Sequence, residues 1–239
     1  IYIEESGGDI LAFVYSIAED LDGNIWIGTD QGPVVYYNPE RIFTEKLKAF
    51  RLRIPRNDGS DIYDYMLSNE TITSIAVDGA NRKWLGTSNS GVYLLSPDGT
   101  LQIRKFTEEN SPLLSNTIIS VAADNKTGEV WFATAKGIQS VRSDAKEGLE
   151  NFKGVYAFPN PVRPDFSGNV TITGLMTGSE IKITDISGNL VYETKSLGGE
   201  ASWNLKTYNG KRVATGVYIA FCSSSDGSKS AAVKILILK

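Results

Sequence analysis

The sequence predicts an all-β chain in which a partial β-propeller, made of three four-stranded blades of a larger propeller, precedes an immunoglobulin-like β-sandwich. Three observations support this fold class. A tryptophan-containing segment recurs three times, a proline-rich stretch follows the third copy, and short alternating runs separated by Gly and Ser turns fill the remainder. We therefore expect two domains, formed by residues 1–153 and 154–239.

The repeat joins a Ser-x-Ala run to a Trp run through a polar turn. Each copy also carries an Asp before the turn and a Gly after the Thr that ends the Trp run. Three copies that share these residues in one order indicate one structural unit used three times. The copies are residues 16–18 with 26–29, residues 74–76 with 84–87, and residues 120–122 with 131–134, with the acids Asp20, Asp78 and Asp124 and the glycines Gly32, Gly91 and Gly137.

Each repeat predicts four short antiparallel strands, which is typical of a propeller blade. The third strand is exemplified by residues 92–95, and candidates for the fourth lie at residues 46–54 and 101–106. Because side chains alternate along a strand, the small residue two positions after each Trp shares its face. We expect the tryptophans to be buried between blades, with the small residues leaving room for the indole of a neighbouring blade. These residues are Trp26, Trp84 and Trp131, and Gly28, Gly86 and Ala133.

The composition changes near residue 150. Residues 151–165 contain three prolines, which fix φ and lack an N–H donor, so we expect a linker there. Six runs beyond it predict the strands of a sandwich, and in the fifth we expect Val217, Ile219 and Phe221 to face the core. The predicted strands are residues 170–173, 180–185, 190–194, 200–204, 216–223 and 231–238.

The composition excludes several functions. The 24 Lys and Arg residues face 28 Asp and Glu residues and form no basic cluster, so we expect no nucleic-acid partner. The chain has no His, which removes the commonest general base and metal ligand, and its one Cys supplies neither an intrachain disulfide nor a thiolate zinc site. We expect no cofactor and no transmembrane segment. Because the sequence begins with Ile1, we also expect it to be a piece of a longer protein.

Candidate catalytic groups are sparse. The spacing of Asp20, Asp22 and Asn24 imitates a calcium loop, but the later positions do not fit, so a β-turn explains it better. Neighbouring carboxylates on a strand point to opposite faces and do not form acid/base pairs. We therefore expect a protein that is not an enzyme. The candidates for ligand contact are exposed aromatic side chains, which suit the faces of sugar rings: Tyr36, Tyr37, Tyr63 and Tyr65.

The first region resembles the two-component regulator propeller repeat. The residues that carry the likeness run from Leu-Ser-Asn through Ser-Ile-Ala and Asp to Trp-Ile-Gly-Thr, most clearly in residues 16–32 and 67–91. The third copy departs from this pattern, with Ala133 in place of Gly and one extra residue in its turn. The resemblance implies an exported bacterial propeller or the sensor ectodomain of a hybrid histidine kinase.

The second region contains a series of motifs in one order, at residues 158–162, 178–183, 185–191, 209–218 and 234–239, with Trp203 between them. In these motifs it resembles the C-terminal sorting domain of the type IX (Por) secretion system of Bacteroidetes. Leu205 and Lys206 depart from the family pattern. The resemblance implies export to the periplasm or the outer surface and docking on the secretion apparatus or outer-membrane proteins. The residues we expect to carry sorting or docking are Gly216, Val217, Tyr218, Lys234 and Lys239.

Three functions from different classes remain open. The preferred hypothesis is a non-enzymatic surface protein that uses the propeller as a binding platform, with a glycan or a lipopolysaccharide as candidate ligand. The alternative is the carbohydrate-sensing periplasmic ectodomain of a hybrid two-component regulator. The third is an exported enzyme whose catalytic blades lie elsewhere, which would require paired carboxylates or metal ligands outside this sequence.

Overall fold

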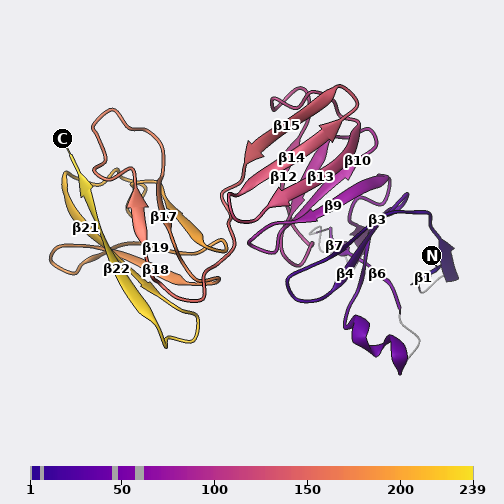
Figure 1. Ribbon diagram of the computed structural model, residues 1–239, viewed down its shortest axis with the longest axis horizontal. Helices are drawn as coiled ribbons and strands as arrows, with labels where there is room; N and C mark the ends of the chain where they lie inside the picture. The colour runs from indigo at the N-terminus through magenta and orange to yellow at the C-terminus, as the bar shows by residue number, and fades with distance from the viewer. Residues whose placement is uncertain (1, 6–7, 45–47, 57–61, 239) are drawn as a thin grey trace. The chain divides into compact units, whose positions relative to one another are not determined.

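The computed structural model describes the chain except residues 1, 6–7, 45–47, 57–61 and 239 (Figure 1). The described residues form β-strands and one short 3-10 helix, η1 (Pro39–Phe43). They divide into two compact units, the first made of residues 1–124 and 129–142 and the second of residues 125–128 and 143–239. Residues 143–153 thus group with the second unit, whereas the domain boundary expected at residue 153 stays a prediction.

The first unit consists of three antiparallel blade sheets and two short ribbons. The blade sheets are β3 (Val14–Glu19), β4 (Ile25–Thr29), β5 (Gly32–Tyr36) and β6 (Phe50–Arg51); β9 (Ile72–Val77), β10 (Lys83–Thr87), β11 (Val92–Leu95) and β12 (Gln102–Phe106); and β13 (Ile118–Asp124), β14 (Glu129–Thr134) and β15 (Gly137–Arg142). The ribbons are β1 (Tyr2–Glu5) with β2 (Gly8–Leu11), and β7 (Arg53–Pro55) with β8 (Tyr63–Tyr65).

The prediction of four strands in each blade is confirmed for two blades and wrong for the third. Among the described residues, the third sheet contains only β13, β14 and β15. After β15, Ser143 donates a backbone hydrogen bond to Gly128. The chain then continues into the second unit and does not turn back along β15. The first two blades close with β6 and β12, which do turn back.

The register of the strands confirms the threefold repeat. Trp26 lies opposite Ala18, Trp84 opposite Ala76, and Trp131 opposite Ala122. Each pairing is followed by a register shift beyond the small residue of the Trp strand. The three tryptophans therefore occupy equivalent positions in their sheets.

The prediction that all three tryptophans are buried is wrong for the last. Trp26 and Trp84 are 1% and 2% exposed, whereas Trp131 is 44% exposed. Trp26 packs in a core cluster with residues of the second blade, and Trp84 packs in a cluster with residues of the third. Trp131 belongs to neither cluster. The difference follows from position, since each buried indole is covered by the blade that comes after its own.

We expected the small residues of the Trp strands to leave room for an indole of the neighbouring blade, and this is wrong. Gly28 and Gly86 instead leave room for an isoleucine side chain of the next blade. A Cβ at Gly28 would lie 2.9 Å from Ile72 Cγ2, and one at Gly86 would lie 2.6 Å from Ile118 Cγ2. Ile72 and Ile118 begin the first strands of the second and third blades. The indole of Trp26 instead contacts the turn at Gly99, where an added Cβ would overlap the ring.

The second unit is a sandwich of two antiparallel sheets, as predicted. Trp203, Ile183 and Ile235 are fully buried in its core. Every predicted strand is present, and β16 is an addition. One sheet contains β16 (Tyr156–Phe158), β17 (Val170–Thr173) and β20 (Glu200–Trp203), and the other contains β19 (Leu190–Lys195), β18 (Glu180–Asp185), β21 (Gly216–Ser223) and β22 (Ser230–Ile237).

The predicted core face of β21 is wrong. Tyr218, Ala220 and Cys222 are buried, whereas Val217 is 37% exposed and Phe221 is 48% exposed. The ring of Tyr218 lies 5.4 Å from that of Trp203, so the core side of β21 already receives two large aromatic groups. The small side chains at the next alternate positions fit beside them. Because both faces of this strand are apolar, alternation alone does not identify the buried one.

The expected linker at residues 151–165 is folded into the sandwich. It contains β16, and Ala157 and Val162 within it are buried. The backbone N–H of Val162 donates to Leu236 O at 2.8 Å, and the N–H of Leu238 donates back to Val162 O at 2.9 Å. The prolines here interrupt a strand that passes from one sheet to the edge of the other.

Candidate functional site

The predicted sorting residues gather where β21 and β22 pair. Gly216 opens β21 opposite Ile237, and Val217 lies opposite Leu236. Tyr218 is buried, and its hydroxyl donates to Ala214 O at 3.0 Å, which fixes the turn that leads into the strand. Lys234 is exposed on β22, and Lys239 lies outside the described residues. Gly216 and Tyr218 thus shape the start of β21, while the side chains of Val217 and Lys234 are exposed.

The outer face of this sheet is more apolar than the predicted residues indicated. Phe221 is 48% exposed and Leu236 is 39% exposed, in addition to Val217. Lys182 and Lys234 are exposed on the same face, since Lys182 lies opposite Phe221. The exposure of Phe221 and Leu236 was not predicted from the sequence. Every residue of β21 from Val217 to Cys222 is apolar. This pattern indicates a strand with two apolar faces, one of which lies outside the core.

Two of the predicted ligand-contact tyrosines line one hollow of about 360 Å³ in the first unit. Tyr37 and Tyr65 contribute aromatic faces there, together with Phe50, whose ring centroid lies 5.8 Å from that of Tyr37. Burial raises the pKa of Tyr37, and nearby Asp98 raises it further. This phenol therefore stays neutral at physiological pH and offers a hydrogen bond.

Two arginines of the same hollow stack on tyrosine rings. The Arg51 guanidinium carbon lies 4.0 Å from the ring centroid of Tyr65, and that of Arg53 lies 4.3 Å from the ring of Tyr63. The remaining candidate, Tyr36, packs against a separate apolar cluster and does not line the hollow. Neither arginine was predicted as a site residue, although their alternate spacing is typical of a shared face in an extended segment.

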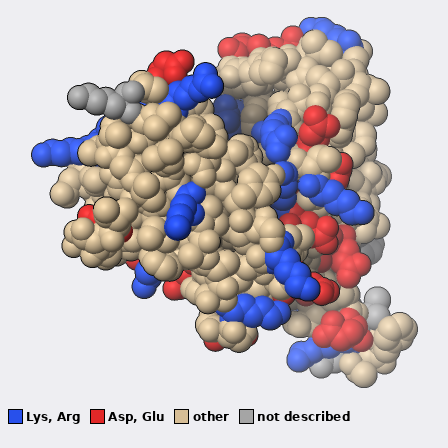
Figure 2. All heavy atoms as spheres, turned by 60° about the vertical axis from the view of Figure 1, so that its left-hand side comes forward, with Lys and Arg blue, Asp and Glu red and all other residues tan. Residues whose placement is uncertain are grey.

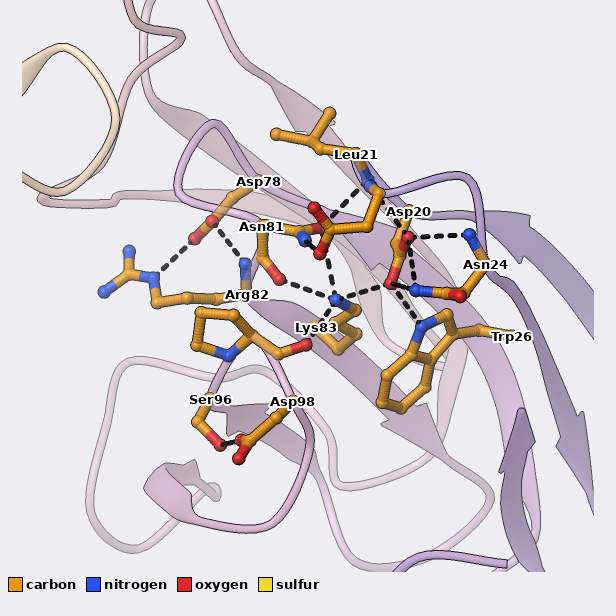
Figure 3. Close-up of polar contacts among 12 residues, drawn as sticks. Asp20, Leu21, Asn24, Trp26, Asp78, Asn81, Arg82, Lys83, Ser96 and Asp98 are labelled. Atoms are coloured by element: carbon orange, nitrogen blue, oxygen red, sulfur yellow. Dashed lines mark hydrogen bonds and ion pairs between the residues drawn. The ribbon is translucent and has the colours of Figure 1, made fainter. Parts of the chain in front are cut away.

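A group of charged side chains around Asp20 and Lys83 in the first unit is a closed structural cluster and not an open site (Figure 3). Asp20 accepts hydrogen bonds from Trp26 Nε1 at 2.8 Å and from the N–H of Asn24 at 2.9 Å, and its carboxylate lies 3.0 Å from Lys83 Nζ. Lys83 Nζ also donates to the carbonyls of Asn81 and Pro97. The side chains of Asp20 and Lys83 are 2% and 0% exposed, so no substrate reaches them.

The pKa shifts in this cluster reflect burial and mutual pairing. Burial lowers the pKa of Lys83, and the hydrogen bond to Asp20 opposes that shift. Burial alone would raise the pKa of Asp20, but hydrogen bonds from Trp26 and Lys83 lower it overall. The carboxylate of Asp20 is therefore stabilised in its charged form, and it organises the turn between strands through its hydrogen bonds to Asn24 and Trp26.

Within the described part of the chain, no group of three or more Asp, Glu, Cys or His side chains is arranged to hold a metal ion. The described residues also include no helix with the length and apolar character needed to cross a membrane.

The architecture defines a class of protein, a regulator-type propeller joined to a sorting-type sandwich, and comparisons with known families support both halves. Residues 10–31 match the family model described as two component regulator propeller. Residues 156–238 match the model described as secretion system C-terminal sorting domain. The second match covers all seven strands of the sandwich. These matches indicate an exported protein.

Among solved structures, the chain is similar to PorZ of Porphyromonas gingivalis, described as an essential bacterial surface component of the type-IX secretion system. The two are 35% identical with a TM-score of 0.70, over 100% of this chain and 32% of PorZ. The extracellular domain of the putative hybrid two component system BT3049 from B. thetaiotaomicron shows 16% identity and a TM-score of 0.41, over 98% of this chain and 45% of that one.

Among curated proteins, Histidine kinase P4 of Formosa agariphila is 31% identical over 93 residues. The aligned part is 38% of this chain and 6% of the kinase. The chain thus spans about a third of PorZ and a small fraction of the kinase.

Proposed function

We propose that this chain acts as a non-enzymatic binding platform at the cell surface of a Bacteroidetes bacterium, associated with type IX secretion. The sandwich docks on the secretion apparatus or on an outer-membrane protein, and the propeller unit holds a ligand. The observation that carries this proposal is the PorZ likeness at 35% identity over the whole chain, combined with the sorting-domain match at residues 156–238.

The docking role is assigned to the start of β21 and the end of the chain. Val217 and Lys234 present an apolar and a basic side chain on the outer face of the sheet. Gly216 and Tyr218 hold that face in shape from beneath, and Lys239 completes the predicted motif. The machinery would recognise a folded surface here and not an extended signal.

The binding role is assigned to the hollow lined by Tyr37, Tyr65, Arg51 and Arg53. Aromatic faces stack on sugar rings, and guanidinium groups pair with carboxylate or phosphate. This combination favours a glycan that carries acidic groups, such as a lipopolysaccharide. Binding of purified lipopolysaccharide should weaken in Arg51→Ala and Arg53→Ala. It should not weaken in the control Tyr156→Ala, which changes an exposed tyrosine of the sandwich. Equal affinity in all three variants would remove this assignment.

The docking role is tested by surface display. The chain, given a signal peptide and a fluorescent reporter, is expressed in a Bacteroidetes host that possesses the secretion system, and surface reporter is compared with periplasmic reporter. The native chain should reach the surface. Removal of residues 231–239 should leave the reporter in the periplasm, because the deletion removes nearly all of β22. The charge reversal Lys234→Glu with Lys239→Glu leaves the core intact and should reduce display without unfolding the protein.

The sensing ectodomain is the second candidate, and the 93-residue similarity to a histidine kinase is the observation that favours it. The sensing hypothesis predicts that removal of residues 231–239 leaves the location of the reporter unchanged in the same assay. A folded chain whose location is unaffected by the truncation would return the sandwich to a purely structural role and support sensing in the periplasm.

A further inference from the structure

β22 is an edge strand whose outer side is only half covered. Its C-terminal half pairs with residues 160–162 through Val162 and through the side chain of Asn160. The amide of Asn160 imitates a peptide group, because its Nδ2 donates to Lys234 O at 2.8 Å and its Oδ1 accepts from Leu236 N at 2.9 Å. The preceding residues of that segment then leave the edge and form β16 in the other sheet.

The N-terminal half of β22 has open backbone groups on that side. In an antiparallel pair, residues alternate between bonding to the partner strand and pointing away from it. The backbone of Leu236 points away from β21, towards Asn160 and Val162. The backbone N–H and C=O groups of every second residue before Leu236, including Ala232 and Ser230, therefore also point away from β21. Both residues are exposed, and no described residue pairs with their outward N–H and C=O groups.

A hollow of about 410 Å³ adjoins this open edge. Its floor and walls come from small side chains, Ala232, Ser230 and Ser223, beside the half-exposed ring of Phe221. Glu180 and Lys182 close its far side. An open strand edge next to a side-chain pocket is the arrangement by which folded domains take up an extended peptide, with backbone hydrogen bonds for affinity and the pocket for selectivity.

The charges beside the edge favour an acidic partner over a second copy of the chain. Lys234 and Lys229 flank the open segment, and Lys182 lines the hollow. The one acidic residue of the lining, Glu180, pairs with Lys195 at 3.7 Å, so positive charge prevails beside the edge. Lysine at an exposed edge opposes pairing with an identical edge, because like charges would meet. The same lysines attract carboxylates.

We propose that the edge from Ser230 to Ala232 is a strand-addition site, which takes an extended acidic segment of the outer-membrane protein that receives the sandwich, with one apolar side chain placed beside Phe221. This proposal rests on the docking role proposed above and specifies how docking occurs. The partner segment continues the line of residues 160–162 along β22, where the chain's own strand has left for the other sheet.

A proline at position 232 tests the site at the level of the backbone. Ala232→Pro removes an N–H that points away from β21, so the ladder between β21 and β22 is retained. The matched control is Glu193→Pro on the opposite edge of the same sheet. Val191 O accepts a hydrogen bond from Tyr208 at that edge, and therefore Glu193, two residues later, also points its N–H outward.

In the display assay, Ala232→Pro should lower surface reporter roughly tenfold or more, because one backbone hydrogen bond and the fit of the added strand are lost. Glu193→Pro should match the native chain, and circular dichroism should show both variants folded. Equal display of Ala232→Pro and the native chain would overturn the strand-addition site while leaving the docking role in place. Equal losses in both proline variants would also overturn it. Failure of the native chain to reach the surface would refute the docking role itself.

A second pair of variants keeps the test valid if proline unfolds the strand. Ala232→Glu and Ala232→Lys change the same exposed position by side chains of opposite charge and leave every backbone group intact. An acidic partner predicts weaker display for Ala232→Glu than for Ala232→Lys. The reverse order would overturn the choice of partner. So would a concentration-dependent dimer of the native chain in sedimentation that Ala232→Pro disperses, because the edge would then bind a second copy.

Discussion

The interface between the first and second blades and the interface between the second and third blades use one register but different chemistry. At both interfaces, the residue that precedes the Trp of the later blade packs against the earlier blade. It is Lys83 at the first interface and Val130 at the second. Lys83 Nζ lies 4.7 Å from the ring centroid of Trp26, while Val130 belongs to the apolar cluster around Trp84.

The turn aspartates show why both solutions work. Each accepts a hydrogen bond from the indole of its own blade, Asp20 from Trp26 and Asp78 from Trp84. Asp20 also forms an ion pair with Lys83 of the next blade. Asp78 instead forms an ion pair with Arg82 of its own turn, with 2.8 Å between Arg82 Nε and Asp78 Oδ2. The first interface is therefore joined by a buried ion pair, whereas at the second an apolar cluster around Trp84 lies beside hydrogen bonds from Thr73 Oγ1 to Ile118 O and from Val121 N to Ser74 Oγ. In these two blades the carboxylate is paired with a cation, which comes from the next blade for Asp20 and from the same turn for Asp78.

The largest expected effect comes from breaking the ion pair. Lys83→Met should lower the free energy of unfolding of the first unit by about 3–5 kcal/mol, because Asp20 is left buried without its counter-ion. Urea unfolding followed by hydrogen exchange in β9 and β10 measures the loss.

The double variant Asp20→Asn with Lys83→Met is the control for that prediction. It removes both charges and should recover much of the stability. If the single and double variants lose the same free energy of unfolding, the ion pair does not join the blades.

The second interface should be sensitive to aromatic truncation instead. Trp84 stacks on Phe106 with ring centroids 5.4 Å apart and lies 5.8 Å from Phe132 of the third blade. Trp84→Ala should cost about 3 kcal/mol or more by the same measurement, as truncation of a buried aromatic usually does. A loss below about 0.5 kcal/mol, the scale of a surface substitution, would contradict the packing shown by the structure.

An acid titration separates the two interfaces by a smaller effect. Because the folded-state pKa of Asp20 is lowered, the unfolded chain binds more protons there, and stability falls as pH drops through the ordinary value of 3.8. The native chain should therefore lose more stability than Asp20→Asn between about pH 5 and pH 3, the range spanned by an ordinary carboxyl group. Thermal unfolding at several pH values measures this difference. Parallel curves for the two proteins would show that Asp20 carries no such linkage.

The sequence predicted those features that depend on local pattern. The sandwich strands follow from runs bounded by Gly and Ser turns, and β17, β18 and β21 occupy the predicted residues. The repeat register follows because identical residues make identical local contacts. Both results need only neighbours along the chain or on the adjacent strand.

Features that depend on a distant partner were not predictable in the same way. The buried face of β21 is decided by Trp203 across the sandwich, while the strand itself is apolar on both sides. The place of Arg51 and Arg53 beside the tyrosines depends on the pairing of β7 with β8. The burial of each Trp depends on the presence of a following blade, which no local pattern encodes.

The smallest expected effect is at the third tryptophan, and it completes the comparison of interfaces. Trp131 occupies the strand position of Trp84 but is 44% exposed, and no described blade packs on its face. Trp131→Ala in the 239-residue chain should therefore cost on the order of 1 kcal/mol or less, close to a surface substitution.

Iodide quenching checks this exposure independently of stability. In the background Trp26→Phe, Trp84→Phe and Trp203→Phe, the fluorescence of Trp131 should be readily quenched, and a matched variant that retains only Trp84 should be protected. A loss near 3 kcal/mol for Trp131→Ala, or a protected signal, would show that part of this chain covers the third blade. The contrast between equivalent tryptophans tests whether burial in this propeller is a property of the neighbouring blade and not of the repeat itself.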